Sequence, residues 1–175
     1  MQEISFDQFI NLENSLDPSV MTVNRVGLIP IIENNGNKYY VLGTDRKTSL
    51  LSDFGGHCDV DSNGKIELPK ECLKRELREE MGGLLSSYII SKLNNEEVRK
   101  KSKIIIKNNG TTAKIEIFMK FDDINGDIYK LIQKFTPTDE IREIKIYDIE
   151  YLEKNTVPST YISSVEFFMK DLLKK

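Results

Sequence analysis

Three glutamates lie close together in the segment RELREEMGG, which spans residues 75–83. At about 100° per residue on a helix, Glu76, Glu79 and Glu80 share one arc, so their like charges repel. Two carboxylates about 6 Å apart repel by about 3 kcal/mol at an effective dielectric near 20. Arg75 can reach Glu79 at the i+4 spacing, but one guanidinium leaves net negative charge. The remaining charge suits a hard divalent cation such as Mg²⁺, which prefers oxygen ligands.

The same pattern has a second interpretation. An apolar arc runs beside the glutamates, and Lys74 and Arg78 lie on the opposite side of the helix. An exposed helix with ion pairs such as Arg75 to Glu79 would carry the same charges. The helix alone therefore fits either a metal site at the edge of a buried face or an ordinary solvated helix. The members of the apolar arc are Leu73, Leu77, Met81 and Leu84.

A glycine-rich segment and a well-marked helix position these residues. The segment DFGGHCDVDSNGKIEL precedes a helix predicted over Pro69–Met81. Pro69 suits the first turn of a helix, and the Gly82-Gly83 pair suits its end.

Strands and helices are expected to alternate around this helix. Strands are predicted over 23–32 and 38–44 around a turn at 34–37, although Pro30 is unusual inside a strand. A second hairpin is predicted from 102–107 and 111–121. This mixture predicts an α+β protein, an α/β/α sandwich with a mixed central sheet. Further elements are expected as a helix at 5–16, a helix at 127–135, a strand at 143–147 and a C-terminal amphipathic helix with Tyr161, Val165, Phe168 and Leu172 on one face.

Composition limits the possible classes. With 175 residues, 39% apolar and 30% charged, the chain is expected to form one domain, residues 1–175. A net charge of −3 argues against a generally basic, nucleic-acid-binding surface. His57 is the only histidine and the two cysteines have no CxxC spacing, so no zinc site is expected. We interpret Cys58 and Cys72 as reduced thiols and, because no segment resembles a signal peptide or a membrane span, the protein as cytoplasmic.

The wider string around the glutamates resembles the Nudix box. That box has the pattern Gly, five residues, Glu, seven residues, Arg-Glu-hydrophobic-any-Glu-Glu-any-Gly-hydrophobic. The chain departs from it twice, since ten residues separate Gly56 from Glu67 and Gly83 stands at the last hydrophobic position. The first departure indicates an insertion around residues 61–64. The matching residues are Glu67, Arg75, Glu76, Leu77, Glu79, Glu80 and Gly82.

The resemblance implies roles for these residues. Glu76, Glu79 and Glu80 would bind Mg²⁺, with Mn²⁺ as an alternative, and the Gly56 carbonyl would be an additional ligand. Arg75 would orient Glu79 or Glu67 by ion pairing. The general base would be either Glu80 or Glu140, which lies in the later segment TPTDEIREI.

The resemblance also implies a reaction, the metal-dependent hydrolysis of a diphosphate linkage in a nucleoside diphosphate-linked substrate. Nucleotides, nucleotide sugars and dinucleoside polyphosphates fit this chemistry. Capped mRNA and diphosphoinositol polyphosphates are the alternatives, so RNA is a possible partner and a membrane is not, while the oligomeric state stays open. Candidate substrate contacts are Arg46 and Lys47 for phosphates and His57 for phosphate or base. Base stacking would use an aromatic side chain such as Phe54, Tyr39 or Tyr40.

Two rival functions remain. The segment DVDSNGKIELPK has spacings similar to an EF-hand calcium loop, but Lys70 occupies the twelfth position, where a bidentate Glu is needed. A simple polar turn is the other interpretation of that segment. A Nudix domain that binds nucleotide without cleaving it is the second rival, and retention of all three box glutamates favours an enzyme.

Overall fold

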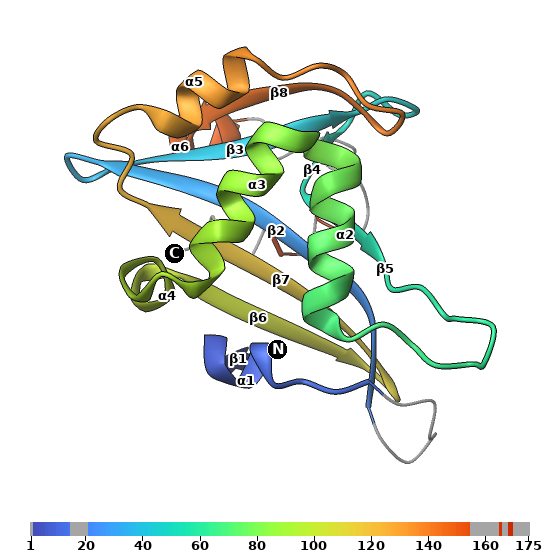
Figure 1. Cartoon of the computed structure of the whole chain (residues 1–175). Helices are drawn as coiled ribbons and strands as arrows, with labels where there is room; N and C mark the ends of the chain where they lie inside the picture. The colour runs from blue at the N-terminus through green and yellow to red at the C-terminus, as the bar shows by residue number, and fades with distance from the viewer. Residues whose placement is uncertain (1, 15–20, 155–164, 166–167, 170–175) are drawn as a thin grey trace.

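A mixed sheet forms the centre of the protein. The computed structural model describes residues 2–14, 21–154, 165 and 168–169. Within these residues the strands are β1 (Gln2–Ile4), β2 (Thr22–Asn34), β3 (Asn37–Asp45), β4 (Leu51–Ser52), β5 (Phe54–His57), β6 (Lys103–Asn109), β7 (Thr112–Phe121) and β8 (Ile141–Asp148). They follow the order β1-β6-β7-β2-β3-β4, with β5 paired to β2 and β8 paired to β3 (Figure 1). β2 and β7 are parallel, whereas the other pairs are antiparallel.

Strand β2 changes partner along its length. One of its edges pairs with β7, and the other pairs first with β5, up to Leu28, and then with β3, from Ile31 onward. Pro30 falls between these two partners, where its missing N–H removes no ladder hydrogen bond to β5 or β3. This position explains how a proline fits inside a central strand.

Both predicted hairpins are confirmed. Asn35 and Gly36 join β2 to β3 with φ values of 52° and 81°, the positive pair that a type I′ turn requires. Gly110 begins the β6–β7 connection with φ 69°, a conformation that glycine adopts without strain.

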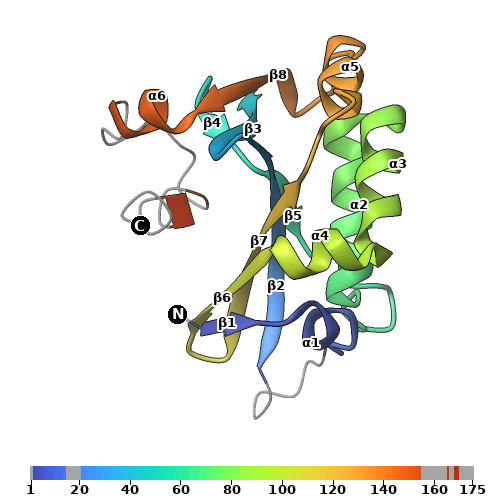
Figure 2. The same cartoon turned by 90° about the vertical axis from the view of Figure 1, so that its left-hand side faces the viewer.

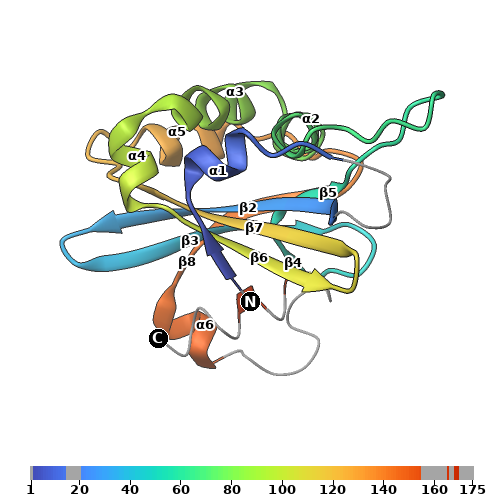
Figure 3. The same cartoon turned by 90° about the horizontal axis from the view of Figure 1, so that it is seen from below.

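Helices cover both faces of the sheet (Figures 2 and 3), which confirms the predicted α/β/α arrangement. The described helices are α1 (Phe6–Ile10), α2 (Pro69–Met81), α3 (Gly83–Ser91), α4 (Glu96–Lys101), α5 (Asp127–Gln133) and α6 (Ile149–Lys154), with a short 3₁₀ turn at Lys92–Asn94. The first five lie on one face, and α6 lies on the other. Apolar side chains fill both interfaces: Val26, Leu77 and Ile115 belong to the α2 side, and Ile29, Phe118 and Val165 to the opposite side.

Helix α2 has the predicted bounds, but one residue of its apolar arc was placed wrongly. Gly82 ends the helix with φ 76°, and α3 starts at Gly83 and packs beside α2. Leu84 therefore belongs to a different helix and is 62% exposed, not buried with Leu73 and Leu77.

Other elements differ in extent from the prediction. Of the helix predicted at 5–16, the structure describes residues 5–14, and within these the helix is α1 alone, which Ser5 caps together with Gln8; residues 15 and 16 lie outside the described residues. The segment 96–103 contains helix α4, for which no helix was predicted; Asn95 caps it and Val98 is buried. The C-terminal stripe is described only at Val165 and Phe168, which are helical and buried; Tyr161 and Leu172 lie outside the described residues. Among the described helices, none combines the length and the apolar character that crossing a bilayer requires.

Candidate active site

The candidate site lies where the glycine strand β5 packs against α2. Two glycines allow this close approach. A Cβ on Gly56 would lie 2.5 Å from the Glu76 carboxyl carbon, and a Cβ on Gly55 would lie 2.3 Å from the Gly27 Cα atom in β2. A side chain at Gly56 would displace the Glu76 carboxylate, and a side chain at Gly55 would push β5 away from β2.

Three carboxylates meet at this junction. Oxygen atoms of Glu76, Glu80 and Glu140 lie within 4.8 Å of one another. Glu76 and Glu80 are buried on α2, whereas Glu140 is exposed and comes from the loop between α5 and β8. Three clustered carboxylate oxygens fit a hard divalent cation such as Mg²⁺ or Mn²⁺.

Burial makes two of these carboxylates hard to ionise without a cation. Desolvation and the charge of Asp53 raise the pKa of Glu80 to about 10, although the Gly55 N–H donates to its Oε2 atom at 2.8 Å. Burial also raises the pKa of Glu76, and a hydrogen bond from Arg75 opposes that shift. A bound divalent cation would favour the ionised form of both groups.

Arg75 ties the loop before α2 to the helix. Its Nε and Nη2 atoms donate to both oxygens of Glu67 at 2.9 and 2.8 Å. Nη1 donates to Glu76 at 2.9 Å and reaches Glu79 at 3.2 Å, while Nη2 also donates to the His57 carbonyl at 2.9 Å. The hydrogen bonds from Arg75 lower the pKa of Glu67. Arg75 thus contacts both Glu67 and Glu79, the two partners expected for it, while its orienting role stays a prediction.

Glu79 is arranged differently from the other two box glutamates. Its side chain is 51% exposed and faces Arg75. It does not belong to the group formed by Glu76, Glu80 and Glu140. Its role as a metal ligand stays a prediction, as does that of the Gly56 carbonyl.

Solved structures with a similar fold include a putative NUDIX hydrolase from Listeria monocytogenes, which is 12% identical over 86% of this chain and 92% of its own, with a TM-score of 0.48. The NUDIX domain of Shewanella oneidensis NrtR, solved with ADP ribose, is 10% identical over 95% of this chain and 97% of its own, with a TM-score of 0.48. An Ap4A hydrolase from C. elegans is 12% identical over 85% of this chain and 93% of its own, with a TM-score of 0.44. The chain is similar to Nudix proteins.

No protein-family model and no curated protein matches the chain. The likeness to the solved structures is distant, so the assignment of roles rests on the chain's own Nudix-box residues and their geometry.

A disulfide joins the end of the glycine strand to α2, which corrects the interpretation of the cysteines as reduced thiols. Cys58 follows β5 and Cys72 lies in the first turns of α2, with Cα atoms 5.2 Å apart. The sequence lacked a cue for this pairing, since 13 residues separate the two cysteines and only the packing of α2 on β5 brings them together.

The insertion before Glu67 forms a polar turn. Asp61 Oδ1 accepts hydrogen bonds from the backbone N–H groups of Asn63 and Lys65. Asp59 instead pairs with Arg75 at 3.2 Å. The polar turn proposed as the alternative to an EF-hand loop therefore describes this segment, since the described residues that could hold a metal are grouped at Glu76, Glu80 and Glu140.

The four residues predicted to contact substrate differ in their exposure and in their hydrogen-bond partners. His57, the last residue of β5, and Lys47 are exposed. Arg46 donates from Nε to the Thr138 carbonyl at 3.0 Å and from its backbone N–H to the Glu140 carbonyl at 2.8 Å. Arg46 thus supports the loop that presents Glu140. Phe54 is fully buried in the core, so its ring is packed against apolar neighbours.

Sequence reasoning missed three charged residues near the site. Arg25, Asp53 and Glu116 are buried together next to Gly27. Asp53 stands immediately before the glycine strand, which was a usable signal, but its partners became apparent only from the pairing of β2 with β5 and β7.

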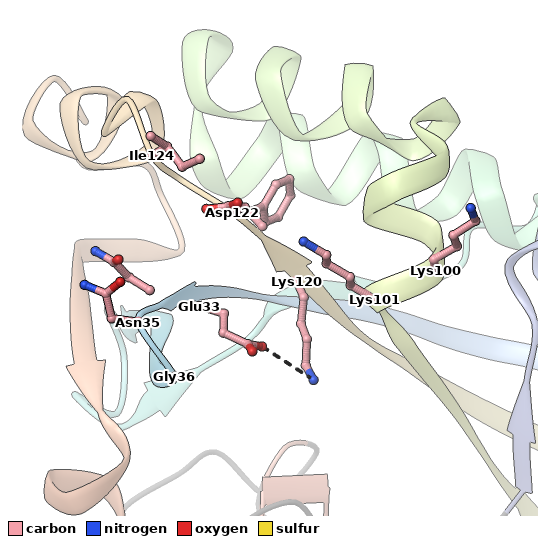
Figure 4. A pocket seen from close by; sticks show the side chains of 10 residues that line it. Glu33, Asn35, Gly36, Lys100, Lys101, Lys120, Asp122 and Ile124 are labelled. Atoms are coloured by element: carbon pink, nitrogen blue, oxygen red, sulfur yellow. Dashed lines mark ion pairs between the residues drawn. The ribbon is translucent and has the colours of Figure 1, made fainter.

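A cavity outside the acidic group lies at another part of the sheet. It has a volume of about 660 Å³ and is lined by the β2–β3 turn, the end of α4 and the end of β7. Figure 4 shows Lys120 directed toward Glu33, its partner at 3.9 Å, while Lys100 and Lys101 point in other directions. Glu33 is six residues along β2 from Gly27, about 20 Å at strand spacing, so this cavity is separate from the acidic group.

Proposed function

We propose that the protein is a Nudix hydrolase that cleaves a diphosphate linkage in a nucleoside diphosphate-linked substrate, using Mg²⁺ or Mn²⁺. The convergence of Glu76, Glu80 and Glu140 beside the glycine strand carries this proposal. The order and spacing of the box residues support it independently.

The side chains divide the chemistry between them. A bound divalent cation would supply Lewis-acid stabilisation of the diphosphate oxygens and would lower the pKa of a bound water. Glu76 and Glu80 would hold the cation, since Arg75 donates a hydrogen bond to Glu76 and the Gly55 N–H donates one to Glu80. Glu140 is the exposed member of the group, so it is placed to accept the proton of the attacking water.

The surrounding residues organise this arrangement. Arg75 neutralises part of the negative charge and orients Glu76. Thr138 donates from Oγ1 to the Glu80 carbonyl at 3.3 Å, which ties the Glu140 loop to α2. His57 is exposed at the end of β5, where it can contact a phosphate group. The substrate class includes nucleotides, nucleotide sugars and dinucleoside polyphosphates, with capped RNA and diphosphoinositol polyphosphates as alternatives.

A substrate panel with matched variants tests this function. Release of phosphate or nucleoside monophosphate is measured with Mg²⁺ for the wild type, Glu76→Gln, Glu80→Gln and Glu71→Gln. Glu71 is exposed at the start of α2 and serves as the control for removing one carboxylate from this helix. Mn²⁺ binding, measured by electron paramagnetic resonance, gives a second readout. We expect the first two variants to lose both activity and Mn²⁺ binding and the control to retain both.

Two results would contradict the proposal. Full turnover in Glu76→Gln and Glu80→Gln would exclude them as metal-holding residues. A wild-type protein that binds nucleotide and Mn²⁺ but cleaves no member of the panel would favour the non-catalytic nucleotide-binding module instead.

A further inference from the structure

A second charged group lies on the face of the sheet opposite α2. Along β2, Val26 and Leu28 face α2, so Arg25 and Gly27 alternate to the other face. Glu116 is the partner of Gly27 in the parallel pair of β2 with β7, and Asp53 precedes β5. The exposed fractions of Arg25, Asp53 and Glu116 are 4%, 0% and 0%. The acidic group and this charged group therefore flank the same short stretch of sheet.

Arg25 is the centre of the second group. Its Nη1 and Nη2 atoms donate to the two oxygens of Asp53 at 2.9 and 2.7 Å, a bidentate pair. Nη1 also lies 3.6 Å from Glu116 Oε2. Gly27 makes room for all three, because a Cβ there would lie 1.8 Å from Asp53 Oδ2 and 2.8 Å from Arg25 Nη1.

A buried ion pair of this kind calls for a reason other than stability, because a well-packed apolar group of similar volume often stabilises a core equally well. Both carboxylate oxygens of Glu116 also lack a hydrogen-bond donor among the described residues. The group therefore keeps two buried carboxylates for one guanidinium. The position of this charged group relative to β5 indicates why a buried ion pair is kept here.

Arg25 holds the glycine strand at both ends. Its backbone is the β-sheet partner of His57, the last residue of β5. Its side chain holds Asp53, the residue before the first residue of β5. Between these two attachments lie Gly55, whose N–H donates to Glu80, and Gly56, which faces Glu76. A shift of β5 along β2 would move both glycines relative to the acidic group.

We propose that Arg25 is a positioning residue for the metal site, which it serves by fixing β5 between Asp53 and His57. The inference rests on the proposed function, because it concerns the same site. Arg25 contacts no substrate and acts through Asp53, Gly55 and Gly56. Its bidentate geometry is essential, since lysine carries the charge but not the planar pair of donors.

The test compares Arg25→Lys, Asp53→Asn and the double variant with the wild type. Arg99→Lys is the matched control, because Arg99 also makes side-chain hydrogen bonds, to Leu93 and Asn94, but its partners lie in the 3₁₀ turn and in α1 rather than in β5. We expect each single variant to weaken Mn²⁺ binding about ten-fold and to lower kcat by about ten- to a hundred-fold, with a smaller change in KM. The double variant should lose no more Mn²⁺ affinity or kcat than either single variant, because the two single substitutions break the same contact. The control should match the wild type.

A purely structural role predicts a different outcome. In that case Tm falls, but Mn²⁺ affinity and kcat, measured well below Tm, stay at wild-type values, and the proposal is overturned. Additive losses of Mn²⁺ affinity and kcat in the double variant would also overturn the proposal. Hydrogen exchange of the Gly55 amide, followed by NMR in metal-free protein, tests the attachment of β5 even if the wild type hydrolyses nothing. Unchanged Gly55 protection in both Arg25→Lys and Asp53→Asn would contradict the positioning role, whereas an inactive wild type would contradict only the proposed function.

Discussion

The Gly55 amide donates a 2.8 Å hydrogen bond to Glu80, so the glycine strand and the acidic helix share one buried contact. This contact accepts either a carboxylate or a neutral carboxyl group, because the carbonyl-like oxygen is available in both. The protonation state of Glu80 therefore changes the charge of the site without removing the contact.

Replacing Glu80 by Gln should stabilise the metal-free protein at high pH. The pKa of Glu80 rises from 4.5 to about 10 on folding, so the stability linked to this group is complete below about pH 4.5 and is lost as the pH rises toward 10. Glutamine mimics the neutral form and avoids this loss. In EDTA, the Tm of the variant should rise relative to the Tm of the wild type by about 3 °C or more as the pH is raised from 5 to 9. A gap in Tm that does not change with pH would contradict the shift, and added Mg²⁺ should raise the Tm of the wild type alone.

Gly56→Ala should disrupt the metal site, because its Cβ would lie 2.5 Å from the Glu76 carboxyl carbon. We expect Mn²⁺ affinity to fall by about ten-fold or more, as for other displaced ligands. Gly83→Ala is the control, since a Cβ at Gly83 meets nothing within 4 Å and Gly83 begins α3. Isothermal titration with Mn²⁺ measures the difference, and equal affinities of the two variants would show that Gly56 is not needed for close approach.

Glu140→Gln should lower kcat by about 10²- to 10⁴-fold if Glu140 accepts the proton of the attacking water. Because Glu140 is exposed, the variant should keep the wild-type Tm. The neighbouring exposed Asp139 supplies the control Asp139→Asn. Steady-state kcat with Mg²⁺ should fall only in Glu140→Gln, and an unchanged kcat in that variant would assign the base to another group.

Reducing the Cys58–Cys72 disulfide should destabilise the protein. A cross-link that closes a loop of about 15 residues contributes about 3 kcal/mol by limiting the unfolded chain. Urea unfolding with and without a dithiol reductant measures this difference. The double variant Cys58→Ala with Cys72→Ala should show the lower stability in both conditions, and a wild type insensitive to reductant would mean that the bond does not form in solution.

Local sequence signals were sufficient to predict the elements whose structure depends on a single segment. Pro69 and Gly82 mark the two ends of α2, and the Asn35-Gly36 pair marks the first hairpin, so both were predicted correctly. Helical periodicity also predicted that Glu76, Glu79 and Glu80 lie beside the apolar arc; Glu76 and Glu80 are buried there, whereas Glu79 is exposed.

Features that depend on distant segments were not predictable in the same way. Strand β5 is four residues long and glycine-rich, so no alternation marks it as a strand. The pairing of Arg25 with Asp53 depends on the register of β2 against β5, which a single sequence does not contain. The exposure of Leu84 follows from the change of direction at Gly82, which a continuous helical wheel ignores.

The exposed turn around Asn63 has a practical consequence for studying this protein. It projects from the sheet in Figure 1, while a covalent link and the Arg75 side chain secure the base of its loop. A fluorescent label or an affinity tag attached at Asn63 would therefore sit outside the packed core, close enough to report on events at the acidic helix and tethered firmly enough to give an interpretable signal.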